Sequence, residues 1–333
     1  MAPAAPALLV GIDTEGDNQW AAAARRRQTF ENIYALERLH DFFARLGVRP
    51  TYFVTYPVAR DERSVDVLRR LAGRGDCEIG AHHHAWETPP CDPADVDRHP
   101  YALSLPLPAF DAQLASLTAA IGDAVGRRPT SYRSGRFGFS AAHVSSLERE
   151  GYDVESSVAP LLYEAHKAGP DFVDAPLAPY FVSYDDPAAP GSSSLLELPV
   201  SAALNRRVPA WLARRYGRAP WPYTTKRLIR LARIAHVRWL RPSYSSAEDM
   251  IALGRQLTAR GVPILNVIFH SSEAIVGGSP YNRTEQELSA FFDRLRRFLE
   301  AARNDLHAVP MTFAECRRHL LSAPYPPAAR ATA

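Results

Sequence analysis

The chain has 333 residues, of which 46% are hydrophobic and 23% are charged, with a formal net charge of +3. This is an ordinary soluble globular composition with enough apolar residues for a sizeable core. Three cysteines (Cys77, Cys91 and Cys316) are too few and too scattered for a disulfide framework or a CxxC metal site. No stretch is long enough to span a membrane, and the first residues lack the basic start of a signal peptide. We therefore expect a cytoplasmic protein in a reducing compartment.

In chain order, short apolar runs alternate with helical patterns. Strands are predicted at residues 7–13, 50–55, 77–82, 130–133, 152–157, 263–270 and 307–310, and weaker strand-like pieces at 180–183 and 195–201. Helices are predicted at about 29–45, 63–74, 108–125, 140–150, 247–260 and 285–303, with a last helix reaching about residue 321. This alternation predicts a parallel sheet with helices outside it.

The fold class that follows is α/β, as a distorted (β/α)7 barrel. Such barrels often exceed 250 residues as one unit, so we predict a single domain over residues 7–321 with an insertion at about 160–245. Residues 1–6 and 322–333 are expected to be a disordered start and tail.

A basic stretch lies inside the insertion. From Asn205 to Arg241 there are eleven Lys or Arg residues and no acidic residue. Residues 223–240 place Leu228, Leu231, Ala235 and Trp239 near one face of an expected helix. A helix packed on the barrel, with its arginines in solvent, is one interpretation. Docking to an anionic membrane, with peripheral attachment to the inner membrane, or to a phosphorylated substrate is the other. We expect no nucleic acid partner.

Polar residues follow five of the predicted strands. The C-terminal strand ends of a parallel β/α barrel meet at one mouth, where active sites form. These polar residues are Asp13, Glu15 and Asp17 after the first strand, His82, His83 and His84 after the third, Arg133 and Arg136 at the fourth, Glu155 at the fifth, and His270 and Glu273 at the strand 263–270. We therefore expect acids, imidazoles and guanidinium groups to converge at one mouth.

Two of these pairs have the spacing of metal ligands. Asp13 and Glu15 are separated by one residue, as are His82 and His84, so each pair points the same way in extended backbone. Carboxylates and neutral imidazoles are ordinary ligands for zinc and similar divalent ions. One carboxylate could bind a metal while the other accepts a proton. Three protein ligands with an open position define a catalytic metal site.

Each residue also has a structural interpretation. Asp13 could cap a helix, Glu273 could cap the segment that follows it, and the histidine run could lie in a surface loop. His270 could be a hydrogen-bonded core histidine, and Arg133 a salt-bridge partner. The functional interpretation is favoured because these residues follow buried-looking strands together.

Five blocks of sequence carry a family resemblance: GIDTEGDNQW, EIGAHHHAW, YRSGRFGF, YDVESSVAP and FHSSEAIVGGSPY. In this order they resemble the polysaccharide deacetylases of the NodB homology type, carbohydrate-esterase family four, and look closest to the WalW-like subgroup. The resemblance covers about residues 7–320. It implies a barrel of the NodB type and a metal-dependent hydrolase that removes N-acetyl groups from an amino sugar.

The resemblance also implies roles for single residues. Asp13 matches the catalytic base, Arg133 the arginine that orients this base, and His270 the general acid. Glu15 matches a metal ligand, although Thr14 stands where the family usually has a second aspartate, and Asp17 remains a competing ligand.

The second motif departs from the family, which usually has two histidines four residues apart. Trp86 stands four residues after His82, so His82 and His84 are taken as the ligands, with His83 as the alternative. The family's oxyanion pocket would lie around residues 135–137. The remaining substrate contacts are assigned to Trp86, Arg136, Phe137 and Tyr281.

The expected cofactor is a divalent metal, with zinc first and cobalt, nickel or manganese as alternatives. The expected substrate is an acetylated amino-sugar glycan, or a lipid-linked or nucleotide-linked precursor of one. Two other functions stay open: hydrolysis of another non-peptide C–N bond on the same scaffold, and non-catalytic carbohydrate binding by a pseudoenzyme.

Overall fold

The computed structural model describes residues 5–92, 98–206, 208–218 and 236–322. Its strands are β1 (Ala7–Thr14), β2 (Thr51–Val54), β3 (Glu78–His83), β4 (Ser131–Ser134), β5 (Val154–Glu155), β6 (Tyr180–Phe181), β7 (Leu196–Glu197), β8 (Ala202–Leu204), β9 (Val237–Trp239), β10 (Ile264–His270) and β11 (Val309–Pro310). Its α-helices are α1 (Ala22–Arg26), α2 (Glu31–Tyr34), α3 (Leu36–Arg45), α4 (Tyr56–Arg60), α5 (Glu62–Arg74), α6 (Leu107–Val125), α7 (Val144–Arg149), α8 (Ala210–Arg218), α10 (Ala247–Ala259), α11 (Glu285–Asn304) and α12 (Phe313–Ser322).

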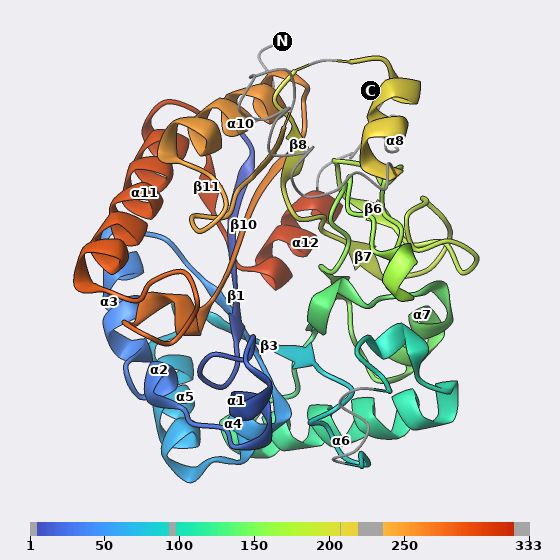
Figure 1. The fold of residues 1–333 in the computed structure, drawn as a ribbon, viewed down its shortest axis with the longest axis vertical. Coiled ribbons are helices and arrows are strands. Elements are labelled where there is room, and N and C mark those ends of the chain that lie inside the picture. The colour runs from blue at the N-terminus through green and yellow to red at the C-terminus, as the bar shows by residue number, and fades with distance from the viewer. Residues whose placement is uncertain (1–4, 93–97, 207, 219–235, 323–333) are drawn as a thin grey trace.

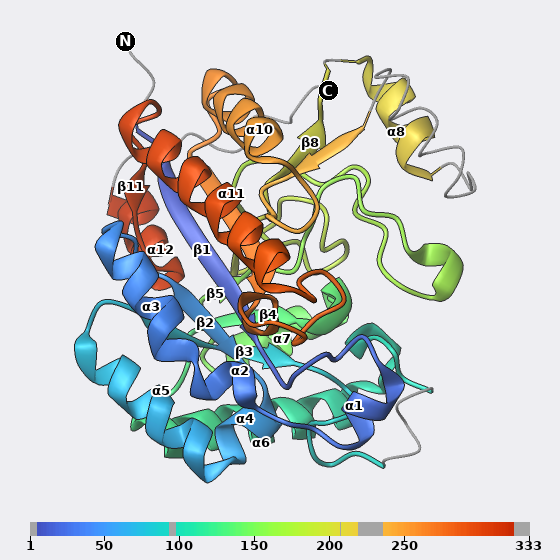
Figure 2. The same ribbon diagram turned by 60° about the vertical axis from the view of Figure 1, so that its left-hand side comes forward.

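The main sheet has the strand order β10-β1-β2-β3-β4-β5-β7-β6, with β11 paired to β1. Neighbouring strands from β10 to β7 run parallel, and β6 is antiparallel to β7. Figure 1 shows β1 and β10 side by side through the centre, with α3, α10 and α11 outside them. Figure 2 shows α5 and α6 covering the sheet next to β2 and β3. The predicted α/β class and curled parallel sheet are confirmed.

The barrel is distorted because the part of its wall between β7 and β10 is irregular. A loop after β7 takes the place of a regular strand pair there. The Ser201 N–H donates to the Asn266 carbonyl at 3.2 Å, and the Asn266 side chain donates to the Leu198 carbonyl at 2.9 Å. Nearer the mouth, the Ile268 N–H donates to the Leu240 carbonyl at 3.0 Å. These separate hydrogen bonds join the two sides of the barrel without forming a regular strand pair.

The predicted elements arise from local signals that the structure reproduces. All eight residues of β1 are buried, as its apolar run indicates. Helix α5 begins at an Asp61 cap and ends at Gly75, whose φ of 74° is the left-handed conformation that glycine favours. Helix α11 begins with a reciprocal capping box between Thr284 and Glu287.

The basic stretch differs from expectation. Residues 219–235 lie outside the described residues, so most of the helix predicted at 223–240 does too. Its last part is wrong, because Val237–Trp239 form β9, which pairs antiparallel with β8. Valine and tryptophan favour strands, and here the partner strand overrides the helical spacing. Trp239 therefore belongs to a sheet. None of the described helices has the length and apolar character needed to cross a membrane.

Candidate active site

A cavity of about 270 Å³ opens at the C-terminal ends of β1, β3, β4 and β10. It is lined by carboxylates, imidazoles, guanidinium groups and aromatic rings from all four strand ends. The lining residues are Asp13, Glu15, Gln19, Trp20, Arg25, His82, His84, Trp86, Ser134, Arg136, Phe137, Arg241, Tyr244 and His270. The expected convergence therefore occurs for Asp13, Glu15, His82, His84, Arg136 and His270. The other expected residues do not line this cavity: Asp17, His83, Arg133, Glu155 and Glu273.

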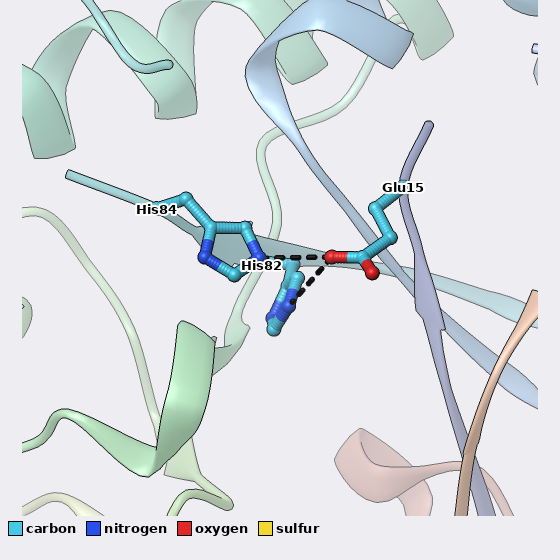
Figure 3. Close-up of side chains that lie close together, drawn as sticks. All are labelled: Glu15, His82 and His84. Carbon is cyan, nitrogen blue, oxygen red and sulfur yellow. Dashed lines mark hydrogen bonds and ion pairs between the residues drawn. The ribbon is translucent and has the colours of Figure 1, made fainter. Parts of the chain in front are cut away.

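Glu15, His82 and His84 form the metal-ligand set predicted from their spacing. Glu15 follows β1, His82 lies in β3, and His84 follows β3, and all three are buried. Figure 3 shows both imidazoles turned towards the Glu15 carboxylate. His84 Nε2 lies 2.8 Å and His82 Nε2 lies 3.8 Å from Glu15 Oε2. One ligand atom from each side chain lies within 4.8 Å of the others, which is close enough to share an ion.

The protonation of the two histidines suits a cation. Burial lowers the pKa of His82 to about 4 and that of His84 to about 3, so both are neutral near pH 7. His82 Nδ1 lies 3.1 Å from the Arg133 carbonyl, which can only accept a hydrogen bond, so this nitrogen carries the proton. His82 Nε2 then presents a lone pair towards Glu15. Burial, aided by the nearby Asp13 and Glu273 carboxylates, raises the pKa of Glu15 despite the opposing effect of His270 and His82.

The two competing ligands are engaged elsewhere. His83 lies on the opposite face of β3, where its Nε2 is 2.8 Å from Gln113 Oε1. Asp17 accepts hydrogen bonds from the backbone N–H groups of Glu31 and Asn32, at 2.9 and 3.0 Å, and so caps α2. Neither side chain lines the cavity.

Asp13 is paired with Arg133 inside the barrel. Arg133 Nη1 donates to Asp13 Oδ1 at 2.8 Å, and Arg133 Nε donates to the Ser156 carbonyl at 2.9 Å. Burial alone would raise the pKa of Asp13, but the charge of Arg133, aided by His82 and His270, holds it well below its usual range. A Cβ at Gly11 would lie 2.5 Å from Arg133 Nη2, so a glycine is needed beside this guanidinium.

His270 faces the carboxylates from the other side of the cavity. Its Nε2 lies 3.9 Å from Asp13 Oδ2 and 3.8 Å from Glu15 Oε1. Its Nδ1 lies 2.8 Å from Oε1 of the fully buried Glu273, which also accepts from Arg241 Nη2 at 2.8 Å. Burial lowers the pKa of His270, but the charge of Glu15 and the hydrogen bond that the imidazole donates to Glu273 outweigh burial and raise it overall. His270 therefore tends to carry a proton.

Three of the four predicted substrate residues line the cavity. Trp86 packs against His84 at a tilt of 37°, with ring centroids 4.1 Å apart, and Arg136 and Phe137 follow the end of β4. Arg136 and Phe137 have φ angles of 52° and 60°, which cost a non-glycine residue about 1–2 kcal/mol each. The fourth, Tyr281, does not line the cavity and packs edge-on against Trp20 at 5.4 Å.

Six cavity residues were not predicted from the sequence: Gln19, Trp20, Arg25, Ser134, Arg241 and Tyr244. Trp20 is the last residue of the block GIDTEGDNQW, which also contains Asp13. Its position in that block could have suggested that it lies near the site. Arg241 was counted only as part of the basic stretch. Glu273 was interpreted as a cap. It does bond the His270 N–H at 3.0 Å, and it also bonds the imidazole.

No known protein family and no curated protein matches this sequence. Among solved structures, one described as a polysaccharide deacetylase from Mycobacterium smegmatis is similar to this chain, with a TM-score of 0.56 and 16% sequence identity. The match covers 98% of this chain and 94% of that one. A glycoside hydrolase/deacetylase from Parabacteroides distasonis is similar with a TM-score of 0.63 and 13% identity, over 97% and 73% of the two chains. A 4-alpha-glucanotransferase from Thermococcus litoralis reaches 0.53 at 13% identity, over 94% of this chain and 40% of that one. The chain therefore has the curled α/β fold of NodB-type deacetylases, a fold shared with a glucanotransferase, so its activity depends on the side chains in the cavity.

Proposed function

We propose that this protein is a divalent-metal-dependent hydrolase that removes the acetyl group from an amino sugar. The observation that carries the proposal is the convergence of Glu15, His82 and His84 within 4.8 Å, beside the buried Asp13–Arg133 pair. Amide hydrolysis by this route uses three metal ligands, a carboxylate that accepts a proton and an imidazole that donates one, and all of these face one cavity.

The donor atoms fit a divalent cation. One carboxylate and two neutral imidazoles form a three-ligand set that leaves positions open for water and substrate, as in catalytic zinc sites. When bound, such an ion acts as a Lewis acid that polarises an amide carbonyl and makes water more acidic. Zinc is our first choice, and cobalt, nickel and manganese suit the same donors.

The chain's own residues supply the proton transfers. Asp13 stays ionised because Arg133 lies against it, so it can accept the proton of an attacking water. His270 tends to be protonated and faces Asp13 across the cavity, so it can donate a proton to the departing nitrogen. Glu273 holds the His270 ring through Nδ1, which leaves Nε2 towards the cavity. Trp86 and Phe137 exclude water from one wall and offer apolar contact to the acetyl methyl or sugar ring.

The substrate and location are finer proposals. Cys77 and Cys316 are free thiols, which suits a cytoplasmic protein. A cytoplasmic enzyme would meet nucleotide-linked or lipid-linked sugar precursors, and lipid-linked ones would place it at the inner membrane surface. The WalW-like subgroup is proposed from the sequence blocks alone. Hydrolysis of another C–N bond would use the same groups and would differ in releasing no acetate from N-acetylglucosamine compounds.

The experiment that tests the proposed function compares Asp13→Asn with the unaltered protein. Both are loaded with zinc or cobalt, and acetate release from N-acetylglucosamine-containing sugars is measured. We expect Asp13→Asn to keep its metal, because the amide oxygen can still accept from Arg133, and to lose at least about a hundredfold in turnover. Asp17→Asn is the matched control, since Asp17 caps α2 outside the cavity. Near-normal turnover in Asp13→Asn would show that the base is wrongly assigned.

A further inference from the structure

Two guanidinium groups, Arg25 and Arg136, line the cavity alongside the candidate metal ligands. Arg25 Nη1 donates to the backbone carbonyls of Gln19 and Trp20 at 2.8 and 3.2 Å, while its buried Nε has no hydrogen-bond partner in the described structure. Arg136 is exposed at the mouth, and its guanidinium carbon lies 4.6 Å from the centre of the Trp86 ring. Among the described residues it has one hydrogen bond, a long contact of 3.4 Å to the Pro100 carbonyl.

Within the described ranges, neither arginine forms an ion pair with a carboxylate. The acids that share the cavity are already engaged, because Asp13 accepts from Arg133 and Glu15 lies against His84. Burial, with the nearby charge of Glu15, raises the pKa of Glu87 to about 8, so this carboxyl group is largely neutral near pH 7. No carboxylate of the described residues therefore neutralises these two guanidinium charges.

The two arginines also act on each other and on the catalytic centre. Partial burial and the like charge of Arg25 both lower the pKa of Arg136. Both guanidinium groups disfavour a positive charge on His84. Binding a divalent ion would add further positive charge to the same cavity. Unpaired cations held together beside a cavity are stabilised by an anionic ligand.

We propose that Arg25 and Arg136 form an anion-binding subsite, and that the substrate is an acetylated amino sugar carrying an oxyanion close to the acetamido group. This rests on the proposed function. The shared chemistry is a phosphate or carboxylate oxygen, which guanidinium groups bind through paired N–H donors. Arg25 is held in place by two carbonyl groups and Arg136 by the Trp86 ring, so little side-chain freedom is lost on binding.

The test measures binding of four sugars to the metal-loaded protein by isothermal titration calorimetry. The neutral probe is methyl N-acetylglucosaminide. The anionic probes are N-acetylglucosamine 1-phosphate, UDP-N-acetylglucosamine and N-acetylmuramic acid, which separate a monoester, a diphosphate and a carboxylate source. We expect at least one anionic sugar to bind about tenfold or more tightly than the neutral one, with an affinity that falls as salt rises. The tightest of the three identifies the anion.

Variants assign this preference to the two residues. Arg25→Gln and Arg136→Gln should each weaken the anionic sugar about tenfold and leave the neutral sugar within twofold. Arg26→Gln is the matched control, because it removes the same charge one residue away from an exposed side chain that does not line the cavity. Equal binding of neutral and anionic sugars, or equal losses in Arg26→Gln and Arg25→Gln, would overturn the proposal. Arg25 lies in α1 and Arg136 in the helical turn after β4, so if one variant fails to fold the other still gives the answer.

The same experiment separates this inference from the proposed function when acetate release is followed in parallel. Tight, arginine-dependent binding of an anionic sugar without acetate release supports the subsite and contradicts the deacetylase. Equal acetate release from neutral and anionic sugars, with unchanged KM in both glutamine variants, supports the deacetylase and overturns the subsite.

Discussion

Arg133 Nη1 donates to Asp13 Oδ1 at 2.8 Å, and both side chains are buried inside the barrel. The pair joins the ends of β1 and β4, and Gly11 provides the space that the guanidinium occupies. The ionised state of Asp13 therefore depends on Gly11, because this glycine leaves room for the guanidinium group that pairs with Asp13.

Gly11→Ala tests this dependence. Its Cβ would lie 2.5 Å from Nη2 and 2.8 Å from Nη1 of Arg133, and a buried guanidinium has little room to move. We expect a loss of about 1–3 kcal/mol in unfolding free energy by urea denaturation, and at least a tenfold loss of turnover. Gly73→Ala in α5 is the matched control, because nothing lies within 4 Å of its added Cβ. Full activity in Gly11→Ala would mean that Arg133 need not hold its present position.

Glu273→Gln should change the pH dependence of turnover. The carboxylate of Glu273 helps to raise the pKa of His270, so its removal lowers that pKa. If protonated His270 is the general acid, the variant loses activity at a lower pH than the wild type does. The alkaline limb of its kcat profile therefore shifts to lower pH by about one unit. Ser243→Ala is the control, since Ser243 hydrogen-bonds Glu273 without supplying its charge. A uniform loss of kcat with an unmoved alkaline limb would contradict this role.

The neighbouring histidines should differ in metal binding. His84→Ala should abolish stoichiometric zinc, measured by plasma mass spectrometry after dialysis, because it removes one of three ligands. His83→Ala should retain zinc and lose about 1–3 kcal/mol of stability, because Gln113 Oε1 loses its buried partner. Equal loss of zinc in both variants would show that β3 does not separate the two side chains as described.

Glu197→Gln should stabilise the protein at alkaline pH. Glu197 pairs in register with Glu155, and burial together with that neighbouring carboxyl group raises the pKa of Glu197 well above its usual value. The folded protein then keeps a proton that the unfolded chain has lost above about pH 4.3, so wild-type stability falls as pH rises from there. Urea unfolding should show the variant gaining on the wild type from pH 5 to pH 8, by up to about 1.4 kcal/mol per pH unit. A constant difference across this range would mean that Glu197 is ionised in the folded protein.

Much of the fold follows from local patterns in the sequence. Buried apolar runs predicted β1 and β10, and helical patterns predicted α5 and α11. The alternation of side chains along an extended segment also predicted that His82 and His84 share a face while His83 does not. These features depend on neighbours in the chain, which the sequence displays directly.

The rest of the site depends on how loops meet in space. Arg25 lies in the short helix α1 after β1, and Arg241 follows β9, so no periodic pattern connects them to the cavity. Glu273 was expected to cap the segment that follows it, but it lies inside the turn 271–274 and bonds back to both the N–H and the imidazole of His270. Helical spacing was extended through Trp239, where pairing with β8 decided the conformation.

The most direct test of the account is anomalous diffraction from crystals of the zinc-loaded protein. We predict one zinc peak about 2.0–2.2 Å from an oxygen of Glu15 and from Nε2 of His82 and His84. The described residues contain one other group with similarly close ligand atoms, formed by His40, Asp76 and Cys77. A zinc peak at that second group with none beside Glu15, or no bound zinc at all, would contradict the proposed metal centre and the hydrolase built on it.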